Sequence, residues 1–212
     1  MTKKLYKFLN GMESKNGSHE WEKGKWYSVE GELEICKNGF HASEHIQDAL
    51  NYVQADTLAA VEVDGEHIED DDKQCWERMR VVKTYEWTRI ESMKLAIYSA
   101  KESKEYFDGD EEIIDDCIDV AGQILNEYEN GREPSEKLLE AAWSAAQSAH
   151  PAESSAARSA AKSAAWSAWS AARSSPWSAA RSASWSASWS AKSAESVKKD
   201  IHEHCLEIVV GD

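Results

Sequence analysis

Tryptophan and basic residues recur at helical spacing near the C-terminal end of the sequence. Units such as SAAW, SAAR and SASW repeat every three or four residues between Trp143 and Glu195. An indole face can stack on a base, and a guanidinium can pair with a phosphate. We therefore expect a surface that binds a nucleotide-type small molecule, and its candidate residues are Trp166, Trp169, Arg173, Trp177, Arg181 and Trp185.

The same residues have a second interpretation, in which they satisfy one another. Tryptophan rings and basic side chains on one helix face can form an internal cation–π ladder or an oligomer interface. No Gly-rich phosphate loop accompanies the repeat, which favours this second interpretation. Because a lone helix cannot shelter the repeat's six tryptophans, we expect the chain to form a homo-oligomer through this region.

A second candidate site lies in the turn Gly39-Phe40-His41-Ala42-Ser43, between an expected strand and an expected helix. Polar residues in such turns often carry function, so His41 is a candidate ligand-binding residue. A loose fold-level similarity to ADP-ribosyl-transferring proteins suggests, as an alternative, an NAD- or ADP-ribose-related enzyme that uses this turn. No nucleophile-and-base pair is visible, so we assign no catalytic residue and favour a non-enzymatic protein.

Metal-ligating residue types are present without a metal-site spacing. Cys36, His41 and His45, with Cys75 farther along, could ligate zinc, but C-x4-H-x3-H is not a strong zinc signature. The acidic run from Glu66 to Asp72 lacks the spacing and glycine of an EF-hand loop. The sequence therefore predicts no metal site and no cofactor, and its four scattered cysteines are interpreted as reduced thiols.

The repeat's composition predicts helix, because alanine is the best helix former. Pro151 and Pro176 interrupt it, so the region is either one kinked helix or a bundle of shorter helices. The unbroken four-residue spacing of Arg173, Trp177 and Arg181 across Pro176 favours the kink. The small alanine and serine side chains would allow partner helices to approach closely.

The preceding residues predict a small mixed or antiparallel sheet with covering helices, and the fold class is α+β. Alternating apolar residues predict strands at 5–10, 26–29, 32–36, 57–63 and 78–87, with a hairpin at Glu30-Gly31. Helical spacing predicts a helix that starts at Ser43, and two amphipathic helices that cover the sheet. The expected domains are 1–88 (α+β), 89–134 (covering helices), 135–200 (repeat) and 201–212 (C-terminal segment).

Charge and hydropathy exclude several partners. The net charge is −15, while residues 143–195 carry a net +3, so the rest is strongly acidic. An acidic surface repels phosphates, so we expect no duplex nucleic acid partner. No apolar run is long enough to span a membrane, so we expect no membrane partner and a cytoplasmic location.

The stretch GKWYSVEGELEICKNGFHASEHIQDALNYV, followed by AAVEVDGE, DDK and VVK, resembles an uncharacterised domain of bacteriophage and prophage proteins. The resemblance covers residues 5 to about 88 by motif and the Ala-rich tail by composition. It implies a phage accessory protein made inside a bacterial cell, and it supplies no catalytic residues.

Taken together, the sequence predicts a non-enzymatic phage protein that self-assembles and binds a host component. Its most specific form is counter-defence by sequestration of a nucleotide-derived immune signal. A purely structural helical scaffold is the remaining alternative.

Overall fold

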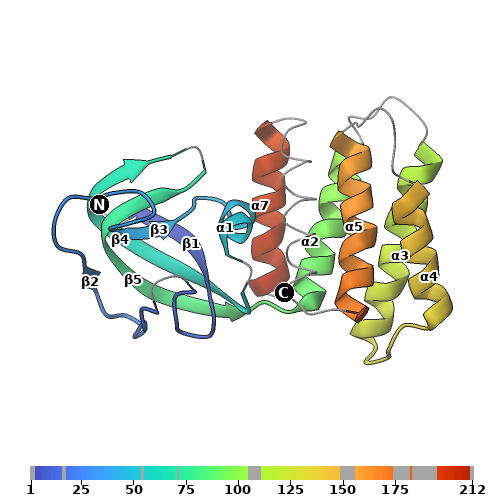
Figure 1. Ribbon diagram of the computed structural model, residues 1–212, viewed down its shortest axis with the longest axis horizontal. Coiled ribbons are helices and arrows are strands. Elements are labelled where there is room, and N and C mark those ends of the chain that lie inside the picture. The colour runs from blue at the N-terminus through green and yellow to red at the C-terminus, as the bar shows by residue number, and fades with distance from the viewer. Residues whose placement is uncertain are drawn as a thin grey trace. The chain divides into compact units, whose positions relative to one another are not determined.

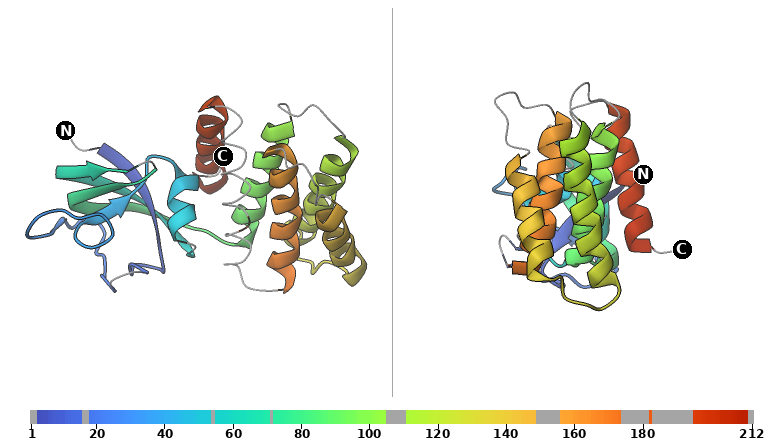
Figure 2. Two further views of the ribbon diagram at one scale, coloured as in Figure 1. Left: turned by 45° about the horizontal axis from the view of Figure 1, so that its top comes forward. Right: turned by 90° about the vertical axis from the view of Figure 1, so that its right-hand side faces the viewer.

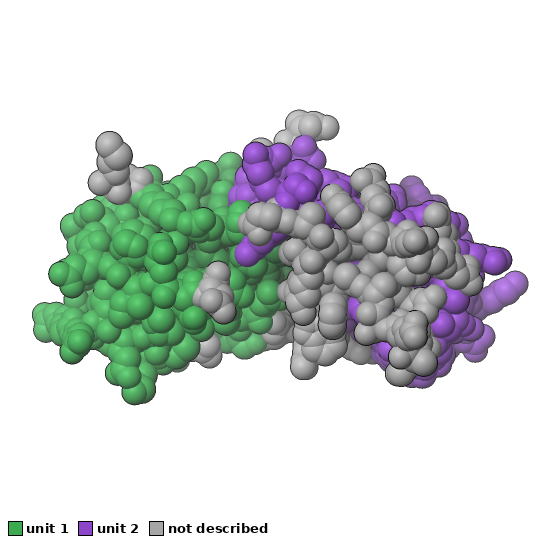
Figure 3. Space-filling model, turned by 90° about the horizontal axis from the view of Figure 1, so that it is seen from above, with its two compact units in different colours: residues 1–87 green, residues 88–212 purple. Residues whose placement is uncertain are grey.

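A computed structural model describes residues 3–15, 18–53, 55–70, 72–104, 111–148, 156–173, 182 and 195–210. The chain divides into an N-terminal unit, residues 1–87, and a C-terminal unit, residues 88–212, which are coloured separately in Figure 3. The described strands all lie in the first unit, and the long helices lie in the second. The expected α+β class is confirmed.

The N-terminal unit is built on a five-stranded antiparallel sheet (Figure 1). β4 and β5 are long neighbours, and β1 pairs with the other edge of β4. The short strands β2 and β3 both pair with β5, at different places along it. The strands are β1 (Lys3–Leu9), β2 (Tyr27–Ser28), β3 (Phe40–Ala42), β4 (Thr57–Glu69) and β5 (Gln74–Glu86).

The sheet curls so that its β3 end meets β1. Ser43, which follows β3, exchanges two backbone hydrogen bonds with Tyr6 of β1, at 2.8 and 2.9 Å. Strand pairing therefore runs from β1 through β4, β5 and β3 and returns to β1. Register shifts in the β4–β5 pair, at Ala60/Val61 and Asp64/His67, provide the local bending that such a closure needs.

Successive side chains of β1 point to opposite faces of the sheet. Leu5 and Leu9 belong to a core cluster with β4 and β5 residues such as Val61 and Met79. Tyr6 and Phe8, on the opposite face of the strand, are also buried, and the helix α1 (Ile46–Tyr52) packs against β1. Lys7 thus occupies the position between Leu5 and Leu9, where the alternation calls for an apolar residue.

Three details of the N-terminal unit differ from expectation. Residues 32–36 form no strand, because the Asn38 side chain donates to the carbonyls of Glu30 and Glu32 and holds the segment as a loop. The expected hairpin is therefore wrong, and Tyr27–Ser28 pairs with β5 instead. The helix begins at Ile46 and not after Ser43, because the backbone of Ser43 is committed to the bridge with β1.

The C-terminal unit is a helical bundle (Figure 2), and α5 packs against three of its helices. α5 contacts α2, α3 and α4, and α7 contacts α2. The small residues of α5 are buried in these contacts, including Ala164, Ala168 and Ser167. The helices are α2 (Arg89–Lys104), α3 (Glu111–Glu129), α4 (Glu136–Ser148), α5 (Ala156–Arg173) and α7 (Glu195–Val210).

The repeat is not one helix across Pro151. The ring of Trp143 in α4 lies 4.8 Å from that of Trp166 and 5.3 Å from that of Trp169 in α5. A continuous helix would separate positions 143 and 166 by about 35 Å, at 1.5 Å per residue. The expected kink at Pro151 is therefore wrong, and α4 and α5 pack side by side; Pro176 lies outside the described residues.

The packing of α5 generates a testable expectation. Ala168 is fully buried, so Ala168→Leu would force three extra carbons between close-packed helices and destabilise the fold by about 1–3 kcal/mol. Ala141 on α4 is exposed, and Ala141→Leu provides the matched control with the same added volume. Urea unfolding measures both; equal midpoints for the two variants would contradict the close packing of α5 around Ala168.

Candidate ligand-binding site

A cavity of about 530 Å³ opens in the N-terminal unit, and we call it the basic cavity. Four lysines and two histidines line it, beside aromatic and aliphatic side chains that include Phe40, Tyr52 and Val29. Its size lies in the range of small-molecule sites. The basic and imidazole residues are Lys7, Lys15, Lys37, Lys73, His19 and His41.

These residues come from separate elements that the curled sheet brings together. Lys7 lies in β1 and His41 in β3, which meet through the Ser43–Tyr6 bridge. His19 lies in the loop after β1, and Lys73 immediately precedes β5. The cavity therefore depends on the closure of strand pairing more than on any single local motif.

The charge of the lining contrasts with that of the protein. The chain has a net charge of −15, yet no aspartate or glutamate is among the described residues that line the cavity. Acidic residues accompany some of these lysines: Lys37 pairs with Glu34, and the Lys73 ammonium lies 3.5 Å from a carboxylate oxygen of Asp70. The lining as a whole favours an anion.

Lys7 has no acidic partner in the described part of the chain. Its ammonium lies over the ring of Trp21, 4.7 Å from the centroid, and no side-chain hydrogen bond or ion pair to it is found there. The residue is partly buried, and desolvation of the ammonium lowers its pKa from 10.5 to about 8. Burial of an uncompensated charge is costly, so this lysine calls for a functional explanation.

His19 lies beside this lysine in an aromatic cluster. Its ring makes edge contacts with Trp21 at 4.7 Å and Tyr27 at 4.6 Å. Its Nε2 atom is buried and has no hydrogen-bond partner among the described residues. Desolvation, followed by the nearby charges of Lys7 and Lys25, lowers the pKa of His19, so the ring is neutral at neutral pH.

His41, the residue expected to contribute from this region, does line the cavity. Its Nε2 accepts a hydrogen bond from the backbone N–H of Cys36, at 3.0 Å, and this bond holds Cys36 at a positive φ of 65°. Desolvation, then the charges of Lys7 and Lys73, lowers the pKa of His41. The neutral ring thus supports the turn, and its Nε2 lone pair is already used.

Gly39 is required by the packing behind this turn. Its φ is +133°, and a Cβ atom there would lie 2.2 Å from the Sγ of Cys75. The Cys75 thiol also lies 3.4 Å from the carbonyl oxygen of Asn38. Only glycine fits at this position, which places Phe40 and His41 against the cavity.

The tryptophan and arginine candidates of the repeat are distributed differently. Trp166 and Trp169 pack edge to face at 5.1 Å, and both contact Trp143, of which 43% is exposed. Arg173 ends α5, and its side chain is outside the description, as are Trp177, Arg181 and Trp185. His41 belongs to the other unit, so the candidates do not form one described site.

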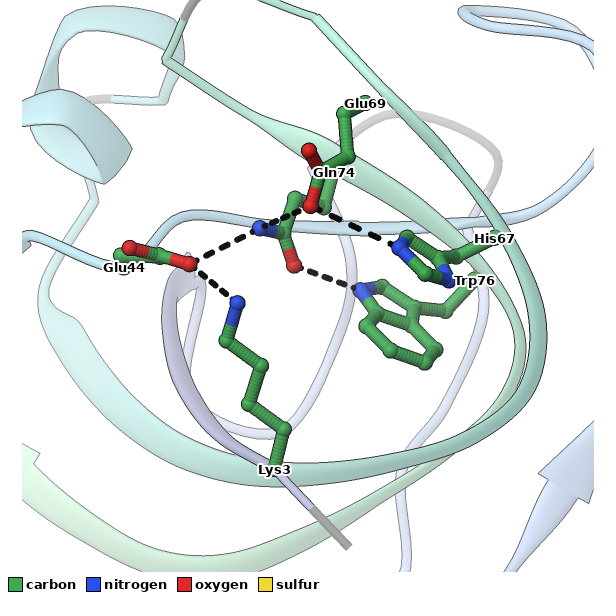
Figure 4. A network of polar contacts seen from close by, with 6 residues as sticks. All are labelled: Lys3, Glu44, His67, Glu69, Gln74 and Trp76. Carbon is green, nitrogen blue, oxygen red and sulfur yellow. Dashed lines mark hydrogen bonds and ion pairs between the residues drawn. The ribbon is translucent and has the colours of Figure 1, made fainter. Parts of the chain in front are cut away.

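A polar network joins the strands near the closure, as Figure 4 shows. Gln74 donates to Glu44 at 3.0 Å and to Glu69 at 3.2 Å, and it accepts from the Trp76 indole at 3.0 Å. Glu44 also pairs with Lys3 of β1. Because Lys3, Glu44 and Gln74 come from three different segments, the network fastens β1 to the β3–β5 side.

Metal-site and membrane-span features are absent from the described ranges. No group of three or more His, Cys, Asp or Glu side chains there could hold a metal ion. The zinc alternative gains no support from His41, whose Nε2 is engaged by Cys36. Among the described helices, none is long and apolar enough to cross a bilayer.

Comparison with known families locates the basic cavity in a recognised domain. Residues 3–93 match the family model described as Domain of unknown function (DUF7666). A DUF7666 domain covers this region. The expected resemblance to an uncharacterised family is thereby confirmed for the N-terminal part, while the phage origin stays a prediction. All residues that line the basic cavity lie within the DUF7666 region.

No curated protein and no solved structure matches the chain.

The network of Figure 4 predicts a pH dependence of stability. The hydrogen bond from Lys3 is the main cause that lowers the pKa of Glu44 below its usual 4.5. A lowered carboxyl pKa stabilises the fold above the unfolded pKa, and this contribution is lost as the pH falls through the folded pKa. Glu44→Gln should therefore flatten the decline of the urea midpoint between about pH 5 and pH 3.

Glu32→Gln is the matched control, since Glu32 is exposed and lies outside this network. Its acid profile should follow that of the unaltered protein. If Glu44→Gln and Glu32→Gln change the profile equally, the network does not contribute in the way described.

Proposed function

We propose that the chain is a non-enzymatic binding protein whose DUF7666 region holds a small anionic ligand in the basic cavity. The observation that carries this proposal is the lining: four lysines and two histidines without a carboxylate among the described lining residues, in a protein of net charge −15. Within that lining, the Lys7 ammonium lies over the Trp21 ring and has no acidic partner among the described residues.

A bound anion would supply the acidic partner that Lys7 lacks among the described residues. A hydrogen bond to a charged group contributes about 1.5–3 kcal/mol, and more of it is retained where water is excluded. The bound anion would also raise the pKa of Lys7 towards its ordinary value, because an opposite charge favours the protonated form. Ligand binding and stability of the N-terminal unit are then linked.

The ligand should also carry a flat or apolar part. Phe40, Tyr52 and Val29 line the same cavity as the cations, and aromatic rings offer stacking surfaces. Anionic groups combined with a planar ring describe a nucleotide. This combination supports the proposal of a nucleotide-derived ligand and moves its favoured site from the repeat to the DUF7666 region.

The biological setting is part of the proposal. The resemblance to phage and prophage domains supports a phage accessory protein in the cytoplasm of a bacterial host. In that setting, a binding protein without chemistry would act by sequestration, and a nucleotide-derived immune signal is the most specific target we propose. Counter-defence then requires affinity and abundance but no turnover.

Self-association through the repeat stays a proposal, although the packing of α5 within the chain already accounts for part of the repeat. The small-residue face of α5 is covered by α2, α3 and α4 of the same chain, so it does not require a second copy. The contacts among Trp143, Trp166 and Trp169 favour the interpretation in which the tryptophans satisfy one another. A purely structural scaffold would leave the basic cavity without a role.

The enzymatic alternative has one favourable observation, since Gly39 to Ser43 lines the cavity. Its candidate residue is poorly suited to proton transfer, however, because His41 Nε2 already accepts the Cys36 N–H. We therefore favour binding without turnover.

The proposal is tested by ligand-induced stabilisation. Thermal unfolding is followed with inorganic phosphate, ADP-ribose and a set of cyclic nucleotides; a ligand at a hundred times its Kd adds about 2.7 kcal/mol and should raise the Tm by several degrees. Lys7→Met should weaken binding of that ligand about 10- to 100-fold, since it removes a charged hydrogen bond.

Lys83→Met is the matched control. The Lys83 ammonium also lies over an aromatic ring, 4.6 Å from that of Tyr85, but Lys83 is exposed and does not line the cavity. Its affinity should equal that of the unaltered protein. Indifference to every anion, or equal binding by the Lys7→Met variant, would refute the proposed function.

A further inference from the structure

We propose that Lys7 is a reactive amine that captures a carbonyl-bearing anionic ligand as an imine inside the basic cavity, with His19 as the proton acceptor. The inference rests on the proposed function, because the cavity must first hold the anion. It goes further by assigning a covalent site and a ligand class, namely an aldehyde or ketone that also carries a phosphate or carboxylate.

The surroundings of Lys7 favour a reactive amine. The residue takes an inward position of β1 between the buried residues Leu5 and Leu9, and its ammonium lies over Trp21. A lysine that served only to attract anions would be more favourably placed in solvent. Desolvation without a carboxylate partner is instead the arrangement that turns lysine into a nucleophile.

The protonation state agrees with this placement. The Lys7 pKa of about 8 gives a free-amine fraction near neutral pH on the order of a hundred times that of an ordinary lysine. Desolvation in the ligand-free protein is the cause of the shift, so the free amine is already populated before the anion enters. The amine is thus available at the pH of a cell.

His19 can serve as the proton acceptor. Its Nε2 atom is buried without a hydrogen-bond partner in the described ranges, and the charge of Lys7 is one of the causes that lower its pKa. Both groups pack on Trp21, with the Lys7 ammonium 4.7 Å from the ring centroid and the His19 ring centroid also at 4.7 Å. A neutral imidazole in this position can take a proton from the ammonium. The contacts with Trp21 and Tyr27 hold the ring in place.

A second cation is available for the anionic group. Lys73 also lines the cavity, and its ammonium lies 4.4 Å from the Tyr52 ring centroid and 3.6 Å from the Sγ of Cys36. Lys73 has Asp70 as one partner at 3.5 Å, and its ammonium carries three donors, so it can also hold the phosphate or carboxylate while Lys7 reacts. Such a division of roles requires a ligand that bears both groups.

The chemistry balances without a redox partner. The Lys7 ammonium gives one proton to His19, and the free amine adds to the carbonyl carbon to form a carbinolamine. The nitrogen–carbon bond becomes the imine as the carbon–oxygen bond breaks, and the oxygen leaves as water with protons returned by His19 and the nitrogen. Hydrolysis reverses the sequence and releases the ligand unchanged.

The experiment uses pyridoxal 5′-phosphate as a probe, because it carries an aldehyde, a phosphate and a planar ring. The full chain is mixed with about one equivalent at about pH 7.5, then treated with borohydride, whose hydride reduces an imine to a stable secondary amine. Peptide mass spectrometry locates the adduct. We expect labelling of Lys7 to exceed that of Lys83 by roughly tenfold or more.

Three variants separate the roles of the side chains. Lys7→Met should abolish the adduct at this site, and Lys83→Met should leave it unchanged. Lys7→Arg keeps a cation but cannot form an imine, so it should still bind pyridoxine 5′-phosphate, the alcohol analogue. His19→Gln should slow adduct formation while binding of the alcohol analogue persists.

The outcomes distinguish this inference from the proposed function. Preferential labelling of Lys7 that pyridoxine 5′-phosphate blocks supports both. Binding of the alcohol analogue without an adduct, or with equal labelling of Lys7 and Lys83, overturns the imine and leaves the anion site standing. If the probe forms no adduct, and neither the alcohol analogue nor any anion of the thermal panel binds, both proposals fall.

Discussion

The bridge between Ser43 and Tyr6 is the constraint on which the N-terminal unit depends. Its two backbone hydrogen bonds return the strand pairing to β1 after it has passed through β4, β5 and β3. Without this closure, Lys7 and His41 would belong to elements with no reason to be neighbours. Side-chain hydrogen bonds of Gln74 to Glu44 and Glu69 add to the stability of the same junction between β1 and β3 (Figure 4).

The sequence predicts the individual helices and strands better than it predicts the contacts between them. The amphipathic pattern of Ile114, Cys117 and Ile124 located α3, and alternation located β1, β4 and β5. The loop at 32–36 was missed because its apolar alternation is real, while the decisive contacts are side-chain bonds from Asn38 to backbone carbonyls. Strand propensity and apolar alternation carry no information about such side-chain hydrogen bonds.

The site was only partly predictable for a related reason. His41 is a candidate because of its turn, whereas Lys7 is not among the candidate residues of the sequence analysis. A signal was available: in LYKFL, lysine takes the place of an apolar residue in the alternation, between Leu5 and Leu9. His19 and Lys73 gave no comparable signal, since they join the cavity through the closure of the sheet and not through spacing.

The small side chains that α5 buries do not by themselves fix its position along the neighbouring helices. A helix that buries mainly alanine and serine presents nearly the same surface after a shift of three or four residues. Several sliding positions against α2 and α3 would then differ little in energy, a degeneracy that larger side chains normally remove. The packed rings of Trp143, Trp166 and Trp169 would be separated by such a shift, so their contacts favour one alignment of α5 along its neighbours.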